Sequence, residues 1–112
     1  MSSAQQSTKF TIVIPTRERC DTLYWSLHTC VSQRYENLEI LVSDNYSQDA
    51  TRDVVMSFND PRIRYVNTGK RVSMTANWEF ALAHVEDGYV TYIGDDDGMM
   101  PNALVELNQL IC

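Results

Sequence analysis

The amino-acid sequence predicts an α/β fold with a Rossmann-like parallel sheet, and the order and spacing of its apolar segments carry that prediction. Short apolar runs typical of buried strands alternate with amphipathic helical patterns, and Pro, Gly or polar clusters separate them. The chain has 112 residues, a length that suits one domain. Because alternating strands and helices require right-handed crossovers, we expect strand order 3-2-1-4 with helices flanking both faces.

The predicted strands are rich in β-branched and aromatic residues, as strands buried on both faces must be. They cover residues 10–14, 39–43, 62–66 and 89–93. Pro15 ends the first strand because it lacks the N–H that the sheet ladder needs.

Each predicted strand is followed by a helical pattern. The first helix has Asp21 as its N-cap, ends near residue 33, and places on one face Leu23, Leu27, Cys30 and Val31. The second covers residues 51–58 and is capped by Ser47 or Asp49. The third begins at Ser73 as its cap and faces the core with Met74, Trp78, Ala81, Leu82 and Val85. The last follows residue 102 and carries on one side Leu104, Leu107 and Ile111. We expect residues 1–8 to be a disordered or loosely attached N-terminus and residues 9–112 to form the domain.

Composition and charge narrow the class of protein. Nine Lys and Arg against fifteen Asp and Glu give a net charge of −6 without a basic cluster, which argues against a nucleic-acid partner. Neither an integral membrane segment nor a signal peptide is recognisable, so we expect a cytoplasmic protein. Cys20, Cys30 and Cys112 have no C-x-x-C spacing, which favours buried thiols over disulfides or a zinc site.

Three polar segments follow predicted strands, and ligands of such sheets bind at the carboxyl ends of the strands. These segments are residues 15–19, 44–49 and 94–98. In the last, Asp95, Asp96 and Asp97 are adjacent carboxylates whose mutual repulsion a divalent cation would relieve. Mg²⁺ or Mn²⁺ together with phosphate oxygens would suit this loop, and the alternative is a solvated acidic turn.

The other polar segments offer groups for a nucleotide. Asp44 and Asn45 could hydrogen-bond the edge of a base, although such residues also cap helices. Groups suited to phosphate follow the first strand and precede the third helix: Thr16, Arg17, Arg19, Lys70 and Arg71. Exposed arginines at such places are commonly just solvated.

Several site classes are missing from the sequence. The segment PTRERCD contains neither G-x-G-x-x-G nor G-x-x-x-x-G-K-[ST], which excludes a dinucleotide fingerprint and a P-loop. Its lack of glycine also argues against a nucleotidyltransferase, and an aspartyl phosphohydrolase would carry D-x-D after the first strand rather than the fourth. We assign no chemistry to His28 or His84, and we expect Trp25, Trp78 and the methionines in core or lid packing.

Four stretches follow one another along the chain in this order: FTIVIPTRERCDTL, EILVSDNYSQDAT, NTG with TANWEFALA, and DGYVTYIGDDDGMMPNAL. Together they resemble the nucleotide-binding half of family 2 glycosyltransferases with the GT-A fold, over nearly all of residues 9–112. The resemblance implies a UDP- or dTDP-type sugar donor and Mn²⁺ or Mg²⁺. It implies that the nucleotide sugar is bound by Pro15, Thr16, Arg17, Arg19, Asp44, Asn45, Arg71, Asn77, Asp95 and Asp96, and the metal by Asp97 and Asp95.

Within this resemblance Asp44 corresponds to the aspartate that bonds uracil or thymine, and the acidic loop corresponds to a D-x-D-type motif. Two positions depart from the family pattern. Asn45 stands where a second acid is common, so base reading could fall on Asp44, Asn45 or both. Gly94 stands at the place of a usual carboxylate; counting back from the following proline favours Asp96 with Asp97 as the pair, whereas D-x-D spacing favours Asp95 with Asp97.

The implied reaction is transfer of a sugar to an acceptor hydroxyl by direct displacement at the anomeric carbon. Family members resemble a longer domain whose later half forms the acceptor cleft and carries the general base, which we expect outside this chain. We therefore expect donor binding with weak or absent turnover, and a saccharide or lipid-linked acceptor. The alternative is a non-catalytic nucleotide- or metal-binding module, with a homo-oligomer covering the incomplete sheet edge.

Overall fold

The structure is a computed structural model that describes residues 8–86, 88–96, 98–99 and 103–111. Strands and helices alternate as β1 (Phe10–Thr16), α1 (Cys20–Val31), β2 (Leu38–Asp44), α2 (Thr51–Ser57), β3 (Ile63–Asn67), α3 (Met74–Leu82), β4 (Tyr89–Tyr92) and α4 (Ala103–Ile111). This alternation confirms the predicted α/β class. The expectation for residues 1–7 lies outside the described residues, whereas the N–H of Thr8 donates to Asn108 Oδ1 at 3.0 Å.

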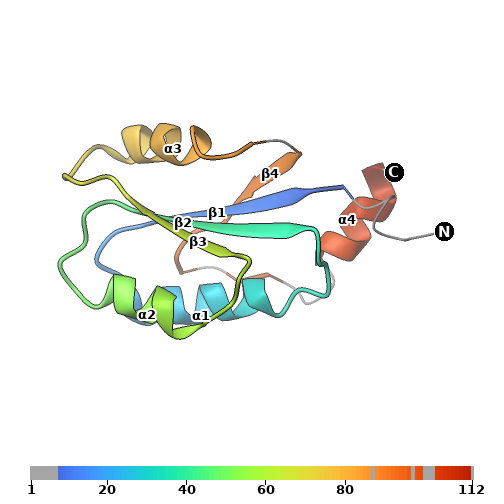
Figure 1. The fold of residues 1–112 in the computed structure, drawn as a ribbon, viewed down its shortest axis with the longest axis horizontal. Coiled ribbons are helices and arrows are strands. Elements are labelled where there is room, and N and C mark those ends of the chain that lie inside the picture. Colours follow the sequence, from blue (N-terminus) through green and yellow to red (C-terminus); the bar gives the residue numbers. More distant parts are fainter. Residues whose placement is uncertain (1–7, 87, 97, 100–102, 112) are drawn as a thin grey trace.

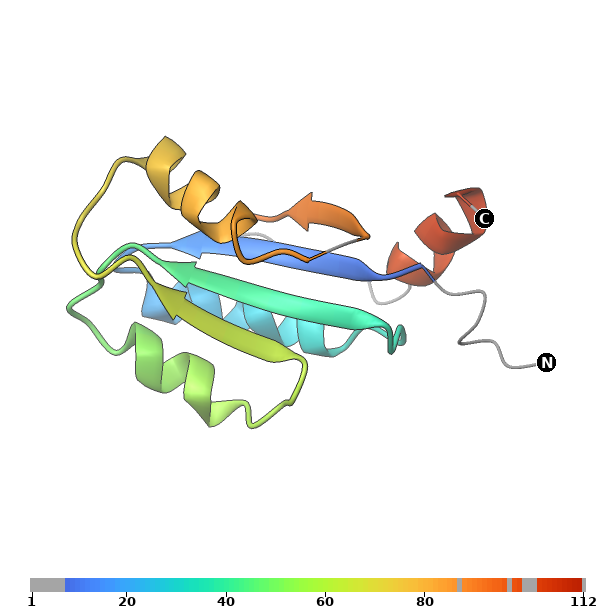
Figure 2. The ribbon, with the colours of Figure 1, turned by 45° about the horizontal axis from the view of Figure 1, so that its top comes forward.

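The strands form one parallel sheet in the order β3-β2-β1-β4, which confirms the predicted order. Thr16 lies opposite Asp44 where β1 pairs with β2, and Val13 lies opposite Tyr92 where β1 pairs with β4. Figure 2 shows all strand arrows pointing the same way, so the carboxyl ends of the strands share one edge of the sheet. The strand order reverses beside β1, and ligands of such sheets bind at that switch point.

Helices cover both faces of the sheet, with α1 and α2 on one side and α3 on the other (Figure 1). Side chains alternate along β1, so Ile12 and Ile14 join the core beneath α1 while Val13 faces α3. The core beneath α1 and α2 contains most of the buried apolar residues. The core beneath α3 is small, since its buried members are Val13, Leu41 and Ala81.

The apolar face predicted for α3 is partly wrong. Ala81 is buried, but the exposed fractions of Met74, Trp78 and Leu82 are 69%, 42% and 46%. The residues that α3 buries are Asn77 and Ala81. Because successive residues of a helix are rotated by about 100°, Trp78 and Leu82 lie on the flank of α3 instead of against the sheet.

Two other large side chains expected in core or lid packing lie outside the core. Trp25 on α1 and Met56 on α2 are 66% and 52% exposed, because both helices turn other residues toward the sheet.

The starts of α1 and α2 depend on one side chain that joins them. α1 begins at Cys20, with Asp21 in its first turn instead of at the cap. The carboxylate of Asp49 accepts the N–H of Cys20 at 3.2 Å and the N–H of Thr51 at 3.0 Å. Burial raises the pKa of Asp49, but hydrogen bonds from Thr51 and Cys20 outweigh it and lower that pKa overall. Asp49 therefore serves the first turns of both helices, although Ala50 holds the N-cap position of α2.

α4 lies near the amino ends of the strands (Figure 1). Its Leu104 is 1% exposed and joins the core beneath α1, while the side chains of Leu107 and Ile111 lie outside the described part. Cys20 and Cys30 are free thiols, and Cys112 is not described. Among the helices of the described ranges, each is too short or too polar to cross a membrane.

Candidate nucleotide-sugar site

A cleft of about 680 Å³ opens at the carboxyl ends of β1 and β4, on the face covered by α3. Segments that are distant in sequence line it: the end of β1, the loop after β4, the loop before α3 and the first turns of α3. Shallow hollows of about 490 Å³ and 300 Å³ lie elsewhere, among the charged residues at the amino ends of the strands and beside α2. The cleft therefore occupies the position that the strand order predicts for a ligand.

Except for Asp44, every residue expected to bind the nucleotide sugar lines this cleft. Its lining includes Pro15, Thr16, Arg17, Arg19, Asn45, Arg71, Asn77, Asp95 and Asp96. Asp97, predicted as a metal ligand, lies outside the described residues.

The acidic wall of the cleft is held by the end of β1. The hydroxyl of Thr16 donates to Asp95 Oδ2 at 2.9 Å, and the backbone N–H of Arg17 also bonds this carboxylate. The side chain of Asp95 is 13% exposed and that of Asp96 is 56% exposed. Burial raises the pKa of Asp95 above its ordinary value, against the lowering effect of the Thr16 hydroxyl and the Arg19 charge.

Cations face these carboxylates. The Nη1 of Arg19 lies 3.5 Å from Asp96 Oδ2, and its Nε lies 3.9 Å from Asp95 Oδ1. The Nε of Arg17 is buried and finds no hydrogen-bond partner among the described residues. Arg71 lines the cleft from the loop before α3. Arg17 thus has a guanidinium donor to offer an incoming acceptor.

The loops after β1 and β2 support each other next to the cleft. Glu18 and Tyr46 both adopt the left-handed region, with φ of 55°, which costs free energy for residues other than glycine. The N–H of Glu18 donates to Ser47 Oγ at 2.7 Å, and the N–H of Gln48 donates to Glu18 Oε2 at 2.6 Å. These paired bonds hold both strained residues in place.

Asp44 is enclosed instead of facing the cleft. It is 1% exposed, and its carboxylate accepts the hydroxyl of Tyr65 at 2.6 Å and the N–H of Ser47 at 3.0 Å. Burial, followed by the bond to Asp44, raises the pKa of Tyr65 to about 12. In this structure Asp44 therefore joins β2, β3 and the loop after β2.

Asn45 and Asn77 connect the walls of the cleft to β2 and to the residue after it through side-chain hydrogen bonds. The Nδ2 of Asn45 donates to the carbonyl of Val72 at 2.7 Å, and its Oδ1 accepts the N–H of Val72 at 2.8 Å. Asn77, which is 3% exposed, accepts the hydroxyl of Ser43 at 2.7 Å and donates to its carbonyl at 3.2 Å. The first pair positions the loop that carries Arg71, and the second positions α3.

Sequence reasoning did not assign Trp78 and Met74 to the site, yet both line the cleft. The Trp78 ring lies 5.4 Å from the ring of Tyr92, at the end of β4. The sequence offered no local signal for Trp78, because Asn77 is buried through its hydrogen bonds to the distant Ser43.

The acidic loop fits a hard divalent cation that is bound together with a phosphate. Within the described ranges, no three His, Cys, Asp or Glu side chains gather to hold a metal by themselves. Asp95 and Asp96 nevertheless supply carboxylates at one wall, and Mg²⁺ typically takes one or two carboxylates with substrate phosphate oxygens and water.

Comparison with known proteins identifies relatives of this arrangement. Residues 11–112 match the family described as Glycosyl transferase family 2. The Campylobacter jejuni enzyme named GalNAc(5)-diNAcBac-PP-undecaprenol beta-1,3-glucosyltransferase is 32% identical over 104 residues, which make up 90% of this chain and 34% of that enzyme.

Solved structures share the fold. S. aureus TarS residues 1–349 superpose with a TM-score of 0.86 at 20% identity, over 92% of this chain and 32% of that one. The mannosyltransferase PcManGT from Pyrobaculum calidifontis, solved with GDP-Man and Mn²⁺, gives a TM-score of 0.78 at 22% identity, over 94% of this chain and 32% of that one.

The chain spans about a third of the length of these relatives. The family match extends over the sheet from the second residue of β1 onward, the cleft and α4. The chain belongs to glycosyltransferase family 2.

Proposed function

We propose that the cleft binds the nucleoside diphosphate of a sugar donor together with a divalent cation, as the donor half of a glycosyltransferase. The observation that carries this proposal is the meeting of Arg17, Arg19 and Arg71 with the carboxylates of Asp95 and Asp96 around one cleft. Guanidinium groups suit phosphate oxygens, and carboxylates suit Mg²⁺ or Mn²⁺.

In this proposal the arginines bind the diphosphate. Arg17 offers its Nε, which has no hydrogen-bond partner in the described part of the chain, and Arg19 exchanges its contacts with Asp95 and Asp96 for phosphate oxygens. Asp95, Asp96 and the undescribed Asp97 are the candidate metal ligands. A bound Mg²⁺ or Mn²⁺ would neutralise negative charge on the departing diphosphate. Thr16 keeps the carboxylate of Asp95 in position through its hydroxyl.

The donor in this proposal is of the UDP or dTDP type. TarS has been solved in complex with UDP and with UDP-GlcNAc, which supports a uridine nucleotide, whereas PcManGT was solved with GDP-Man. Asn45 lines the cleft, so we assign it the contact nearest the base. Direct reading of the base by Asp44 would require its carboxylate to leave Tyr65 and Ser47. We therefore infer that Asp44 acts by shaping the loop.

The acceptor is proposed to be a lipid-linked saccharide, because the Campylobacter relative is named for an undecaprenol diphosphate substrate. A general base outside this chain would take the proton of the acceptor hydroxyl as its oxygen attacks the anomeric carbon and the bond to the diphosphate breaks. A cytoplasmic location belongs to the same proposal, and the free thiols of Cys20 and Cys30 are compatible with a reducing compartment.

The second candidate function is a binding module without turnover. The edge strand β4 exposes Tyr89 and Tyr92, which are 54% and 39% exposed, and a homodimer through this edge would cover them. Sedimentation of the chain over a range of concentrations tests that association.

Calorimetry with UDP, in the presence and absence of Mn²⁺, tests the proposed function. We expect Mn²⁺ to strengthen UDP binding, and Asp97→Ala or Asp96→Ala to remove that gain while the fold is retained. Equal UDP affinity with and without Mn²⁺ would overturn the metal site. GDP and dTDP titrations report base preference, and donor hydrolysis by this chain would exclude the module without turnover.

A further inference from the structure

A line of polar side chains begins on α1 and continues just past its end. Ser26 and Thr29 lie at i and i+3, a spacing that places them on one side of α1, and Gln33 follows the C-cap residue of this helix. Ser26 is 1% exposed and Gln33 is 4% exposed. Polar groups so deeply buried need hydrogen-bond partners. We call these three residues the polar stripe.

The partners of the polar stripe belong to the chain that leaves β4. The hydroxyl of Ser26 donates to the carbonyl of Gly94 at 3.0 Å. Thr29 Oγ1 accepts the N–H of Met99 at 3.0 Å. Gln33 Oε1 accepts the N–H of Leu104 at 3.3 Å.

Thr29 also lies against Gly98. Its hydroxyl also donates to the carbonyl of Ser26 at 2.7 Å, so donor and acceptor are both used. A Cβ placed on Gly98 would lie 3.3 Å from the Cγ2 of Thr29. The backbone of the acidic loop therefore rests directly on Thr29, at a residue without a side chain.

We propose that the polar stripe positions the acidic loop for its metal-bound nucleotide, an inference that rests on the proposed function of the cleft. The contacts at Gly94 and Met99 bracket Asp95 and Asp96 in the sequence, on the side of the loop that faces α1. Thr16 holds Asp95 from the end of β1. The carboxylates are thus supported from two elements before any ligand arrives. Such support matters because small displacements of liganding groups weaken metal binding strongly.

Paired variants of Thr29 test the proposal. Thr29→Val keeps the shape of the side chain but loses the acceptor for the N–H of Met99, whereas Thr29→Ser keeps the hydroxyl. The matched control is Ser32→Ala, because among the described residues the hydroxyl of Ser32 bonds only the carbonyl of His28, one turn earlier in the chain, at 2.8 Å. UDP affinity is measured by calorimetry with Mn²⁺ and with EDTA, and melting temperature is recorded for each variant.

We expect Thr29→Val and Ser26→Ala to weaken UDP binding about tenfold or more with Mn²⁺, because this is the usual effect of losing a group that supports a metal ligand. In EDTA, both variants should bind UDP as the wild type does. Thr29→Ser and Ser32→Ala should bind as the wild type does. Retention of the Mn²⁺ gain by Thr29→Val, or equal losses with Mn²⁺ and EDTA, would overturn the positioning role.

Hydrogen exchange of the free protein separates this inference from the proposed function. Thr29→Val should speed amide exchange in residues 94–99, while Thr29→Ser does not. Failure of the wild type to bind UDP would overturn the proposed function, and the polar stripe would then be judged by this exchange alone. Unchanged amide exchange in Thr29→Val would overturn the positioning role of the polar stripe.

Discussion

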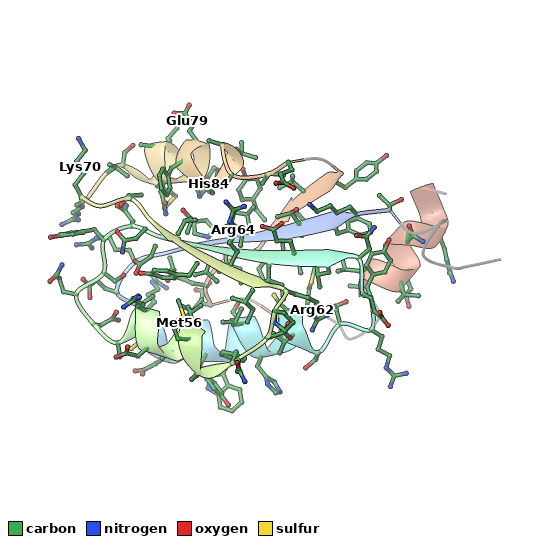
Figure 3. All side chains as sticks on the ribbon, viewed as in Figure 1. Met56, Arg62, Arg64, Lys70, Glu79 and His84 are labelled. Carbon is green, nitrogen blue, oxygen red and sulfur yellow. The ribbon has the colours of Figure 1, made fainter. Side chains whose placement is uncertain are left out.

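At the scale of single residues, Arg62 joins parts of the chain that the sequence keeps apart. Its Nη2 donates to the carbonyl of Val31 at 2.8 Å, which satisfies a backbone acceptor at the end of α1. The same side chain holds Asp60 through Nε at 3.2 Å and Nη2 at 2.9 Å. Figure 3 shows Arg62 between β3 and α1. This guanidinium therefore links the first crossover to the edge strand.

We expect Arg62→Ala to lower the free energy of unfolding by about 2 kcal/mol, since charged hydrogen bonds are lost and backbone acceptors are left unpaired. Arg64→Ala, in the adjoining strand β3, is the control. The side chain of Arg64 is 44% exposed, and its Nη1 lies 3.4 Å from Glu39 and donates to the carbonyl of His84 at 3.0 Å, so its removal should cost about 1 kcal/mol or less. Urea denaturation at pH 7 compares the two, and equal losses would contradict the role of Arg62.

The ion pair of Arg62 and Asp60 predicts that the stability of the fold depends on pH. The hydrogen bond from Arg62 lowers the pKa of Asp60 below its ordinary value of 3.8. A carboxyl whose pKa is lowered by folding stabilises the fold above its unfolded pKa and loses that contribution as the pH falls through the folded pKa. The stability gap between wild type and Asp60→Asn should therefore be full at pH 7 and shrink in acid below 3.8. A gap that is constant down to low pH would contradict this.

At the scale of elements, α3 begins where the cleft needs it. Ser73 takes the N-cap with an extended backbone, and its side chain accepts the N–H of Ala76 at 3.1 Å. Asn45 holds Val72, the residue before the cap. Figure 3 shows Lys70 in the same loop, directed away from the sheet, whereas Arg71 lines the cleft. The loop that leads into α3 therefore also forms part of the cleft wall, and Asn45 anchors it.

α3 has nine residues, a length at which isolated helices are marginal, so the cap should matter. We expect Ser73→Ala to lower the free energy of unfolding by about 1 kcal/mol and Ser73→Asp to restore most of it. Thr75→Ala, an exposed change inside the helix, should cost nothing. Chemical denaturation of the four proteins makes the comparison; a Ser73→Ala variant as stable as Thr75→Ala would count against the cap.

At the scale of the whole molecule, the two faces of the sheet are unequally covered. α1 buries Leu23, Leu27 and Cys30 against the sheet, whereas α3 buries Asn77 and Ala81. Burial raises the pKa of the Cys30 thiol to about 12, as an apolar environment should. The cleft therefore opens on the less tightly packed face.

Hydrogen exchange followed by mass spectrometry should show this asymmetry. Amides of α1 should exchange more slowly than those of α3, because fewer buried apolar contacts hold α3 in place. Saturating UDP with Mn²⁺ should slow exchange in α3 and in residues 67–73, and leave α1 unchanged. Equal protection of both helices in the free protein would contradict the argument.

Much of the fold could be read from local patterns. Strand runs such as FTIVI, the breakers between them and the chirality of crossovers sufficed for the strand order and for the edge that carries the site. They sufficed also to bring Arg17, Arg71 and Asp95 to one cleft. The cap at Ser73 was predictable too, because it depends on a bond within a few residues.

Other features depended on partners far away in the chain. Asp44 was expected to face a ligand, but Tyr65, 21 residues later, encloses it. Trp78 was expected in the core, and the bond of Asn77 to Ser43 turns a different face of α3 inward. The polar stripe had no interpretation until the structure showed its hydrogen bonds to Gly94, Met99 and Leu104.

The sequence alone determined element types, their order and the edge where function resides, because periodicity and turn chemistry act over a few residues. The tertiary structure decided which polar groups already have hydrogen-bond partners, which apolar side chains stay exposed and which elements support the acidic residues. Hydrogen bonding and burial are properties of pairs, and the deciding partners here lie 21 to 79 residues apart.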